Sequence, residues 1–286
     1  MKLSGLNTLI TGGSQGLGRH LVEAFLAEGA NVVFCARTAA DVAQTQIELN
    51  SQLQPGQQLI GQTCDIADPA SVAALFARTA HLGRLHAVVN NAGIYGPIGP
   101  TEDLTLAEWT QAWQVNVTGT LLVCQHAIRA MKTHGGGKII NISGGGATNP
   151  MPRFAAYAAT KAAVVRLTET LAEEYRANHI DVNAIAPGAL RTRLTAQVLA
   201  AGPELAGADF FAKNKKWSDE GAADPKLAAA LGVFLASSAS DGITGKLISA
   251  QWDPWKEPAK FRTLATGDVY TLRRIVPEDR VKNFPT

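Results

Sequence analysis

The sequence has only three cysteines in 286 residues, and they are far apart, at Cys35, Cys64 and Cys124. They form neither a CxxC pair nor the Cys/His spacing of a zinc site, so a disulfide or a metal site has no support. We expect them to be small buried apolar side chains in a reducing compartment. The sequence also lacks a secretory leader and any apolar stretch long enough to span a membrane, so we expect a cytoplasmic protein.

An excess of charge of one sign is also missing. The formal net charge is +2 at pH 7, which gives no general electrostatic basis for binding nucleic acid or a membrane surface. Hydrophobic residues make up 46% of the chain and charged residues 17%, an ordinary globular composition that argues against extended disorder. At this length we expect one large α/β domain with a sizeable core.

Short β-rich apolar runs alternate with segments of helical periodicity along most of the chain. The runs expected to be strands are 6–10, 31–35, 59–64, 85–90, 138–142, 180–185 and 246–249. The segments expected to be helices are 17–28, 38–53, 69–82, 104–131, 154–176 and 226–236. This alternation predicts a doubly wound parallel sheet in three α/β/α layers, with ligands at the carboxyl ends of the strands.

No shift in composition divides the chain into two domains, and we assign residues 1–253 to one domain. Residues 190–224 interrupt the alternation with Gly, Pro and mixed helix formers, which is typical of a mobile lid over a substrate. Residues 254–286 lack clear periodicity and are expected to form a C-terminal tail.

A glycine-rich turn joins the first predicted strand to its helix. Gly12, Gly16 and Gly18 follow the strand directly. Such a turn lets the backbone approach a pyrophosphate, while the helix N-terminus offers free N–H groups to its charge. The spacing is neither GxGxxG nor a Walker loop, and taken alone it fits an ordinary glycine turn as well as a phosphate site.

A tyrosine and a lysine lie four residues apart, at Tyr157 and Lys161. On a helix both side chains project from one face, so the ammonium can lower the pKa of the phenol from its usual value of about 10. That shift would suit Tyr157 for general acid/base chemistry near neutral pH. Because chance supplies such pairs, this one needs support from its surroundings.

Several motifs in one order support both sites. They are Thr11–Gly12–x3–Gly16–x–Gly18, Asp65 after the third strand, Asn90–Asn91–Ala92–Gly93 after the fourth, Asn116 in the long helix, Ser143 after the fifth strand, Tyr157–x3–Lys161, and Pro187–Gly188 after the sixth. In these motifs, residues 4–250 resemble the short-chain dehydrogenase/reductase family. The resemblance implies a Rossmann fold and an NAD(P)-dependent oxidoreductase that acts on CH–OH groups.

The resemblance also implies a role for each site residue. Tyr157 would exchange a proton with the substrate oxygen, and Lys161 would lower its pKa and hold the nicotinamide ribose. Ser143 would bind the substrate oxygen, and Asn116 would anchor a water in a proton relay. The residues expected to contact the cofactor are Gly12, Ser14, Gln15, Gly16, Leu17, Gly18, Arg37, Asp65, Ile66, Asn91, Ala92, Gly93, Tyr157, Lys161, Pro187, Gly188 and Thr192.

The end of the second strand bears on cofactor choice. An acidic residue there would bind the adenosine ribose and favour NAD, but the chain has Ala36 and then Arg37. A guanidinium can pair with a 2′-phosphate, so we predict NADP, with NAD as the alternative. The competing interpretation is a solvated loop arginine, and Gln15 adds no second basic residue to the glycine turn.

The serine is one residue out of the family's usual register. Thirteen residues separate Ser143 from Tyr157 where the family commonly has twelve, and Gly144 occupies the usual serine position. Either the glycines at 144–146 accommodate the extra residue in a bulge, or the substrate oxygen is held differently. We expect Ser143 to serve, because Thr148 is the one other hydroxyl nearby.

The tail and the tryptophans leave alternatives open. Trp252, Trp255 and the Arg273–Arg274 pair could close over a polar or phosphorylated substrate, or the tail could wrap a neighbouring subunit or be partly disordered. Trp109 and Trp113 are spaced for one helix face, in the core or an interface. The resemblance implies a dimer or tetramer, and we expect a homotetramer.

The sequence therefore predicts an NADP(H)-dependent enzyme that interconverts a secondary alcohol and a ketone on a small molecule. The alternative is a nucleotide-binding regulatory or structural protein without turnover, since fold alone does not determine function. Asn116, Tyr157 and Lys161 favour the enzyme, and the serine spacing alone favours the alternative.

Overall fold

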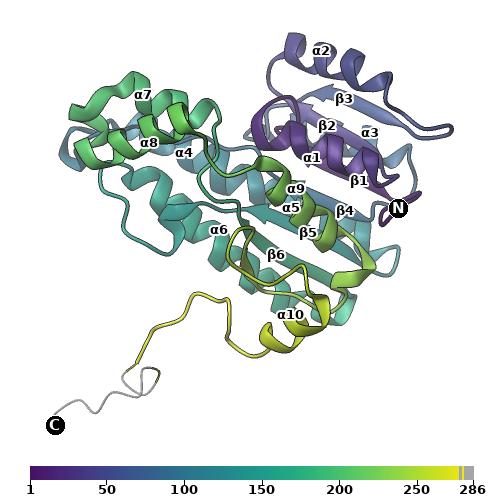
Figure 1. Cartoon of the computed structure of the whole chain (residues 1–286). Helices are drawn as coiled ribbons and strands as arrows, with labels where there is room; N and C mark the ends of the chain where they lie inside the picture. Colours follow the sequence, from purple (N-terminus) through teal and green to yellow (C-terminus); the bar gives the residue numbers. More distant parts are fainter. Residues whose placement is uncertain (277–278, 280–286) are drawn as a thin grey trace.

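Seven parallel strands form one sheet in the order β3-β2-β1-β4-β5-β6-β7 (Figure 1). This computed structural model describes residues 1–276 and 279. The strands are β1 (Asn7–Thr11), β2 (Asn31–Ala36), β3 (Leu59–Thr63), β4 (Ala87–Asn90), β5 (Gly137–Ile142), β6 (Ile180–Ala186) and β7 (Leu247–Ser249). Helices cover both faces of this sheet, so the predicted doubly wound three-layer fold is confirmed.

Two apolar clusters bury the two faces of the sheet. One face packs against α1 (Gly16–Ala27), α2 (Ala39–Asn50) and α9 (Pro225–Ala236). The other packs against α3 (Pro69–Ala80), α5 (Thr120–Lys132) and α6 (Ala155–Glu174). Cys35, Cys64 and Cys124 are free thiols in the second cluster, so the prediction that they are small buried side chains is confirmed.

The strand order reverses between β1 and β4. The strands β2 and β3 run outward from β1 on one side, and β5, β6 and β7 run outward from β4 on the other. Connections leave the carboxyl ends of β1 and β4 in opposite directions, which opens a crevice between them. The glycine turn after β1 and the Asn91–Gly93 loop after β4 therefore meet at one place.

The long helix predicted at 104–131 is three helical segments. It consists of α4 (Leu106–Trp113), a π-helical turn (Gln114–Gly119) and α5. A π turn adds one residue per turn, and such turns are frequent at functional sites. Here the turn contains Asn116. Shorter 3₁₀ turns occur at Thr101–Asp103, Gly145–Ala147, Arg176–Asn178 and Ser238–Ser240.

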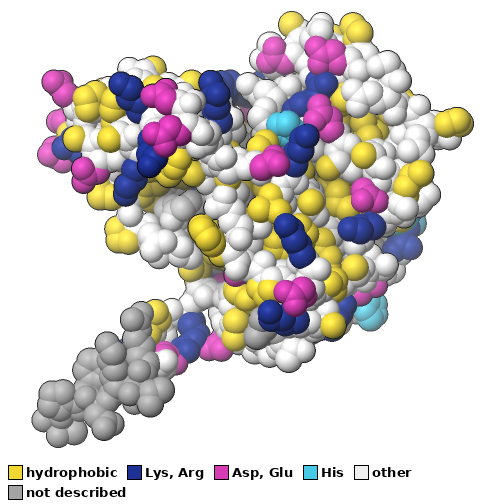
Figure 2. All heavy atoms as spheres, in the orientation of Figure 1, with side chains coloured by type: hydrophobic (Ala, Val, Ile, Leu, Met, Phe, Trp, Pro, Cys, Tyr) yellow, Lys and Arg dark blue, Asp and Glu magenta, His cyan; other side chains and the backbone are white. Residues whose placement is uncertain are grey.

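The segment predicted to be a lid, 190–224, consists largely of α7 (Arg193–Ala206) and α8 (Ala208–Glu220). A kink interrupts α7 at Gly202, whose φ is 75°, directly before Pro203. The two helices pack on each other and project from the body beside α4 (Figure 1). Figure 2 shows basic and acidic side chains intermingled over this projecting part.

The described part of the predicted tail folds back onto the domain. Trp255 and Phe261 are buried against Phe234, and Phe261 belongs to α10 (Pro258–Leu264). The Lys246 ammonium donates hydrogen bonds to the carbonyls of Gly267 and Val269, at 2.7 and 3.0 Å. The body therefore holds this segment through both apolar and polar contacts. The remainder, 277–278 and 280–286, lies outside the described residues.

Of the tail residues considered for substrate binding, Trp255 is in the wrong place. Its indole N–H donates to the Ala250 carbonyl at 3.0 Å, inside the core. Arg273 pairs with Asp268 and Asp279. Trp252 is 83% exposed and borders the central cavity described below, so it alone of these four residues lies at the cavity.

Within residues 1–276 and 279, no helix is long and apolar enough to cross a bilayer.

Candidate active site

A cavity of about 1300 Å³ extends from the carboxyl ends of the strands to the underside of α7 and α8. It is far larger than a single water site and exceeds the range of about 300–1,000 Å³ that is usual for ligand clefts. Every residue that the sequence predicts to contact the cofactor lines it, and so does Ser143. Asn116 does not line it. The fold thus brings together predicted site residues that lie up to 180 positions apart, from Gly12 to Thr192.

The glycine turn is built so that only glycines fit. Gly12 and Gly16 have φ values of 66° and 53°, in the left-handed region that other residues rarely adopt. A Cβ on Gly18 would lie 1.9 Å from the Gly12 carbonyl oxygen, so α1 can approach the turn only without a side chain there. The Asn91 amide fastens the turn by donating to the carbonyls of Thr11 and Gly12, at 3.0 and 3.1 Å.

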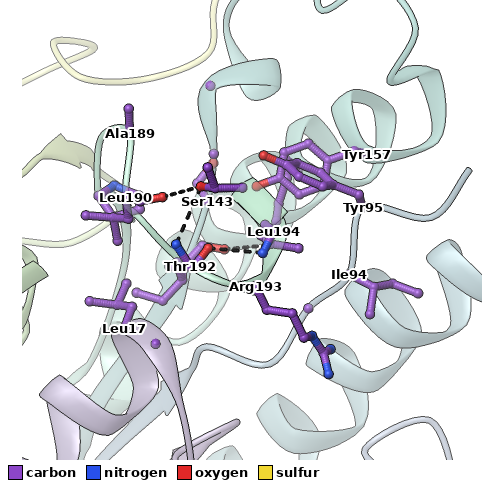
Figure 3. A pocket seen from close by; sticks show the side chains of 18 of the residues that line it. Leu17, Ile94, Tyr95, Ser143, Tyr157, Ala189, Leu190, Thr192, Arg193 and Leu194 are labelled. Carbon is purple, nitrogen blue, oxygen red and sulfur yellow. Dashed lines mark hydrogen bonds between the residues drawn. The ribbon is translucent and has the colours of Figure 1, made fainter. Parts of the chain in front are cut away.

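The N-terminus of α1 fits a phosphate. The N-cap residue, Gln15, makes no side-chain capping hydrogen bond, and the first turn contains no acidic residue. The backbone N–H groups of that turn are therefore available to an anion, and the helix dipole favours negative charge at the same point. Leu17, in this first turn, faces the cavity (Figure 3).

Tyr157 and Lys161 lie one turn apart on α6 and are both buried, at 7% and 5% exposure. The Lys161 ammonium donates to the Ile142 carbonyl at 2.8 Å and lies 5.7 Å from the centre of the Tyr157 ring. The helix therefore places both groups on one face, as the four-residue spacing predicts.

Their ionisation differs from the prediction. Burial raises the pKa of Tyr157 well above its usual value, and the neighbouring Tyr95 raises it further. Burial also lowers the pKa of Lys161 to about 8. The expected lowering of the Tyr157 pKa is thus wrong. The cause is desolvation, which disfavours both charged forms, together with an ammonium that bonds a carbonyl and not the phenol.

Asn116 lies behind this pair. Its amide N–H₂ donates to the Ile94 carbonyl at 2.8 Å and to the Thr160 hydroxyl at 3.0 Å, and its oxygen accepts from the Ile94 N–H at 2.9 Å. A Cβ on Gly93 would lie 3.2 Å from the Asn116 oxygen and 3.5 Å from the Lys161 ammonium. Asn116 therefore fixes the loop after β4 against α6, beside Lys161.

The residue that faces the Tyr157 hydroxyl is Gly144. A Cβ at Gly144 would lie 2.3 Å from that oxygen. The backbone stays extended through Gly144 and turns at Gly145, so no bulge before Gly144 moves Ser143 into its position. Ser143 is 2% exposed, and its hydroxyl has no hydrogen-bond partner among the described residues.

Two further predicted residues, Thr192 and Arg37, line the cavity away from Tyr157 and Lys161 in the sequence. Thr192 caps α7 by accepting from the Leu194 N–H at 3.2 Å, and its side chain lies against Gly16. Arg37 is exposed at the end of β2, on the cavity wall beside Asp41. Arg37 and Tyr157 therefore line the same cavity, although they come from β2 and α6.

Sequence reasoning missed an aromatic wall beside Tyr157. The Tyr95 ring meets the Tyr157 ring edge-on, with 4.6 Å between centroids, and contacts Phe154 at 5.2 Å. Phe210 of α8 packs on Phe154 at 4.8 Å, and Trp217 follows it. Tyr95 comes directly after the Asn-Asn-Ala-Gly-Ile run, and that position was the available signal. The aromatic residues of α8 carried none, because they lie in a segment without clear pattern.

Comparison with known proteins identifies the family. Residues 7–202 match the short chain dehydrogenase family. A short-chain type dehydrogenase/reductase of Picea abies is 33% identical over 255 residues, which cover 86% of this chain and 91% of that protein. Levodione reductase of Leifsonia aquatica is 32% identical over 243 residues, which cover 81% of this chain and 88% of that protein.

A solved structure shows the same fold. A putative NAD(P)-dependent gluconate 5-dehydrogenase from Beutenbergia cavernae, with bound NADP at low occupancy, superposes with a TM-score of 0.76 at 30% identity. The match covers 87% of this chain and 96% of that chain. The chain therefore belongs to the short-chain dehydrogenase/reductase family and is an NAD(P)-dependent Rossmann-fold oxidoreductase that acts on CH–OH groups.

Proposed function

We propose that the protein interconverts a secondary alcohol and a ketone on a small molecule in the cytoplasm, with NADP(H) as cofactor and Tyr157 as the acid/base. One observation carries the proposal. Tyr157 and Lys161 line the same cavity as the glycine turn and the uncapped N-terminus of α1. A dinucleotide bound along that cavity would supply the hydride, and the chain supplies position and charge.

The proton step rests on Tyr157 and Lys161. Tyr157 lines the cavity, which supports its access to the substrate oxygen. Lys161 uses one N–H on the Ile142 carbonyl, which leaves two donors for the cofactor ribose and for charge that develops on the phenol. In the reducing direction Tyr157 gives its proton to the oxygen that becomes the alcohol.

Two further residues have proposed roles. Ser143 binds the substrate oxygen. The Ser143 hydroxyl is buried without a hydrogen-bond partner among the described residues, which supports this role, because a bound ligand would supply the missing hydrogen bond. Asn116 acts behind Lys161, where it orders the loop that ends in Gly93 and anchors a proton-relay water. The residues around Arg37, Asp65 and Asn91 hold the adenosine half of the cofactor.

The assembly is proposed to be a homo-oligomer, a dimer or tetramer. The helix α4 offers a face for it. Leu106 is 78% exposed, Trp109 and Trp113 pack 6.3 Å apart, and the buried indole N–H of Trp113 has no partner within residues 1–276 and 279. A neighbouring subunit over this face would cover the apolar surface.

Initial-rate assays test the function and the cofactor together. The protein is incubated with NADPH or NADH and a panel of ketones, sugars and keto acids, and the nicotinamide absorbance is followed. We expect turnover with at least a tenfold preference for NADPH, about 1.4 kcal/mol. Because the Arg37 guanidinium is expected to pair with the 2′-phosphate, Arg37→Ser should lose most of this preference while its NADH kinetics stay unchanged.

The matched control is Arg176→Ser, at an exposed arginine far along the chain and outside the cavity. It should leave both cofactors unaffected. A tenfold preference for NADH in the unchanged protein would contradict the NADP assignment. Absence of turnover with either cofactor across the panel would contradict the proposed reaction itself.

A further inference from the structure

Tyr95 occupies a position in the site that the roles above leave unused. It lies on the loop after β4, lines the cavity and meets the Tyr157 ring edge-on at 4.6 Å. Figure 3 shows the hydroxyl ends of both rings on the same side, turned toward Ser143. Both tyrosines line the cavity, so a ligand in it can reach them. Two phenol donors thus face one region of the cavity.

The residue beside the Tyr157 hydroxyl is Gly144, which has no hydroxyl to offer a substrate. Because a Cβ on Gly144 would lie 2.3 Å from the Tyr157 oxygen, no side chain fits there without displacing the tyrosine. A substrate oxygen next to Tyr157 therefore receives no hydrogen bond from a side chain at position 144. Ser143, one residue earlier, lines the cavity and supplies one hydroxyl donor. An oxygen that gains negative charge during hydride transfer needs preorganised donors, and Tyr95 is placed to be one.

We propose that the Tyr95 hydroxyl donates a hydrogen bond to the reacting oxygen of the substrate, alongside Tyr157. Tyr95 is then a second catalytic residue for the reaction proposed above, and this inference rests on that reaction. The two phenols have different roles. Tyr157, beside Lys161, exchanges the proton, and Tyr95 keeps its own proton and stabilises the charge on the oxygen.

The surroundings of Tyr95 suit a donor that does not ionise. Burial raises its pKa to about 12, so it stays protonated throughout the pH range of an assay. The Lys161 ammonium lies next to Tyr157 and bonds the Ile142 carbonyl. Phe154 also packs edge-on against the Tyr95 ring, with 5.2 Å between centroids, and helps to hold its orientation.

Tyr95→Phe tests the proposal, because it removes one oxygen and keeps the ring that packs on Tyr157 and Phe154. Tyr175→Phe is the matched control, since Tyr175 follows α6 and lies outside this cavity. We expect kcat to fall about 100-fold in Tyr95→Phe, the usual effect of losing one donor to a developing oxyanion. NADPH affinity and the thermal midpoint should stay unchanged in both variants.

A binding measurement separates this inference from the proposed reaction. Cyclohexanone is titrated into the complex with NADP⁺, which cannot reduce it, and the protein fluorescence is followed. We expect Kd for cyclohexanone to rise roughly tenfold in Tyr95→Phe, about the worth of one hydrogen bond, and not in Tyr175→Phe.

Equal kcat and equal ketone affinity in Tyr95→Phe and the unchanged protein would overturn the inference. So would a loss of NADPH affinity and thermal stability in the variant, which would assign Tyr95 a packing role, or an absence of cyclohexanone binding by the unchanged protein. Ketone binding that depends on Tyr95 without any turnover would support the inference and count against the proposed reaction alone.

Discussion

At the scale of single residues, burial controls the charges at the site. Lys161 is 5% exposed and bonds one carbonyl, so desolvation holds its pKa near 8 in place of the usual 10.5. The sequence spacing correctly predicts that Lys161 and Tyr157 share a helix face. It cannot predict their ionisation, because desolvation depends on what the rest of the fold packs around them. A bound cofactor and substrate add charges and donors that change this balance.

Lys161→Met should therefore stabilise the fold while abolishing turnover. A lysine whose folded pKa is lowered costs stability while it is protonated. The cost is full below about pH 8, and it disappears as the pH rises toward 10.5, the value of the unfolded chain. A shift of that size corresponds to about 3 kcal/mol. We expect the variant to have a free energy of unfolding higher by up to this amount at pH 7, and a smaller gain at pH 10, by urea denaturation.

The control for this prediction is Lys215→Met, on the exposed surface of α8, which should change stability little at either pH. A Lys161→Met variant that is less stable than the unchanged protein at pH 7 would show that the ammonium is favourably held, and would contradict the account of its burial.

At the scale of elements, the strands and most helices could be predicted from the sequence because their apolar spacing is regular. The π turn at Gln114–Gly119 could not, because one extra residue in a turn leaves the apolar pattern of 104–131 nearly unchanged. The helices α7 and α8 were missed as helices because Gly202, Pro203 and Gly207 interrupt their periodicity. The glycine turn was correctly placed, since its residues immediately follow a regular strand.

The close contact of the turn with α1 gives a prediction for Gly18→Ala. The new Cβ would lie 1.9 Å from the Gly12 carbonyl oxygen, a backbone atom that moves only if the turn opens. We expect NADPH affinity to fall at least tenfold and the free energy of unfolding to fall by about 1–3 kcal/mol, as in other overpacked sites. Fluorescence titration and urea denaturation measure the two effects.

Gly145→Ala serves as its control, because a Cβ there meets no atom within 4 Å. That variant should keep its stability and its NADPH affinity. Normal NADPH affinity in Gly18→Ala would contradict the assignment of the glycine turn to the cofactor.

At the scale of the whole molecule, the sheet collects the site from distant parts of the chain. The strands β1, β4, β5 and β6 end at one edge, where the loops after them meet the face of α6 that carries Tyr157. This convergence follows from parallel strands and was predictable. The docking of residues 254–276 could not be predicted, because Trp255 and Phe261 are isolated apolar residues in the sequence. Their burial depends on the surface presented by α9. The position of Gly144 against Tyr157 likewise depends on how β5 and α6 pack.

The central claim is that this cavity performs proton-coupled reduction through Tyr157. The most direct measurement compares NADPH oxidation by the unchanged protein and by Tyr157→Phe, with the fastest ketone of the panel. The account predicts that kcat falls by about 1,000-fold or more, within the range for loss of a general acid, while the circular dichroism spectrum and NADPH affinity are retained. A Tyr157→Phe variant that keeps a tenth or more of the activity would contradict it.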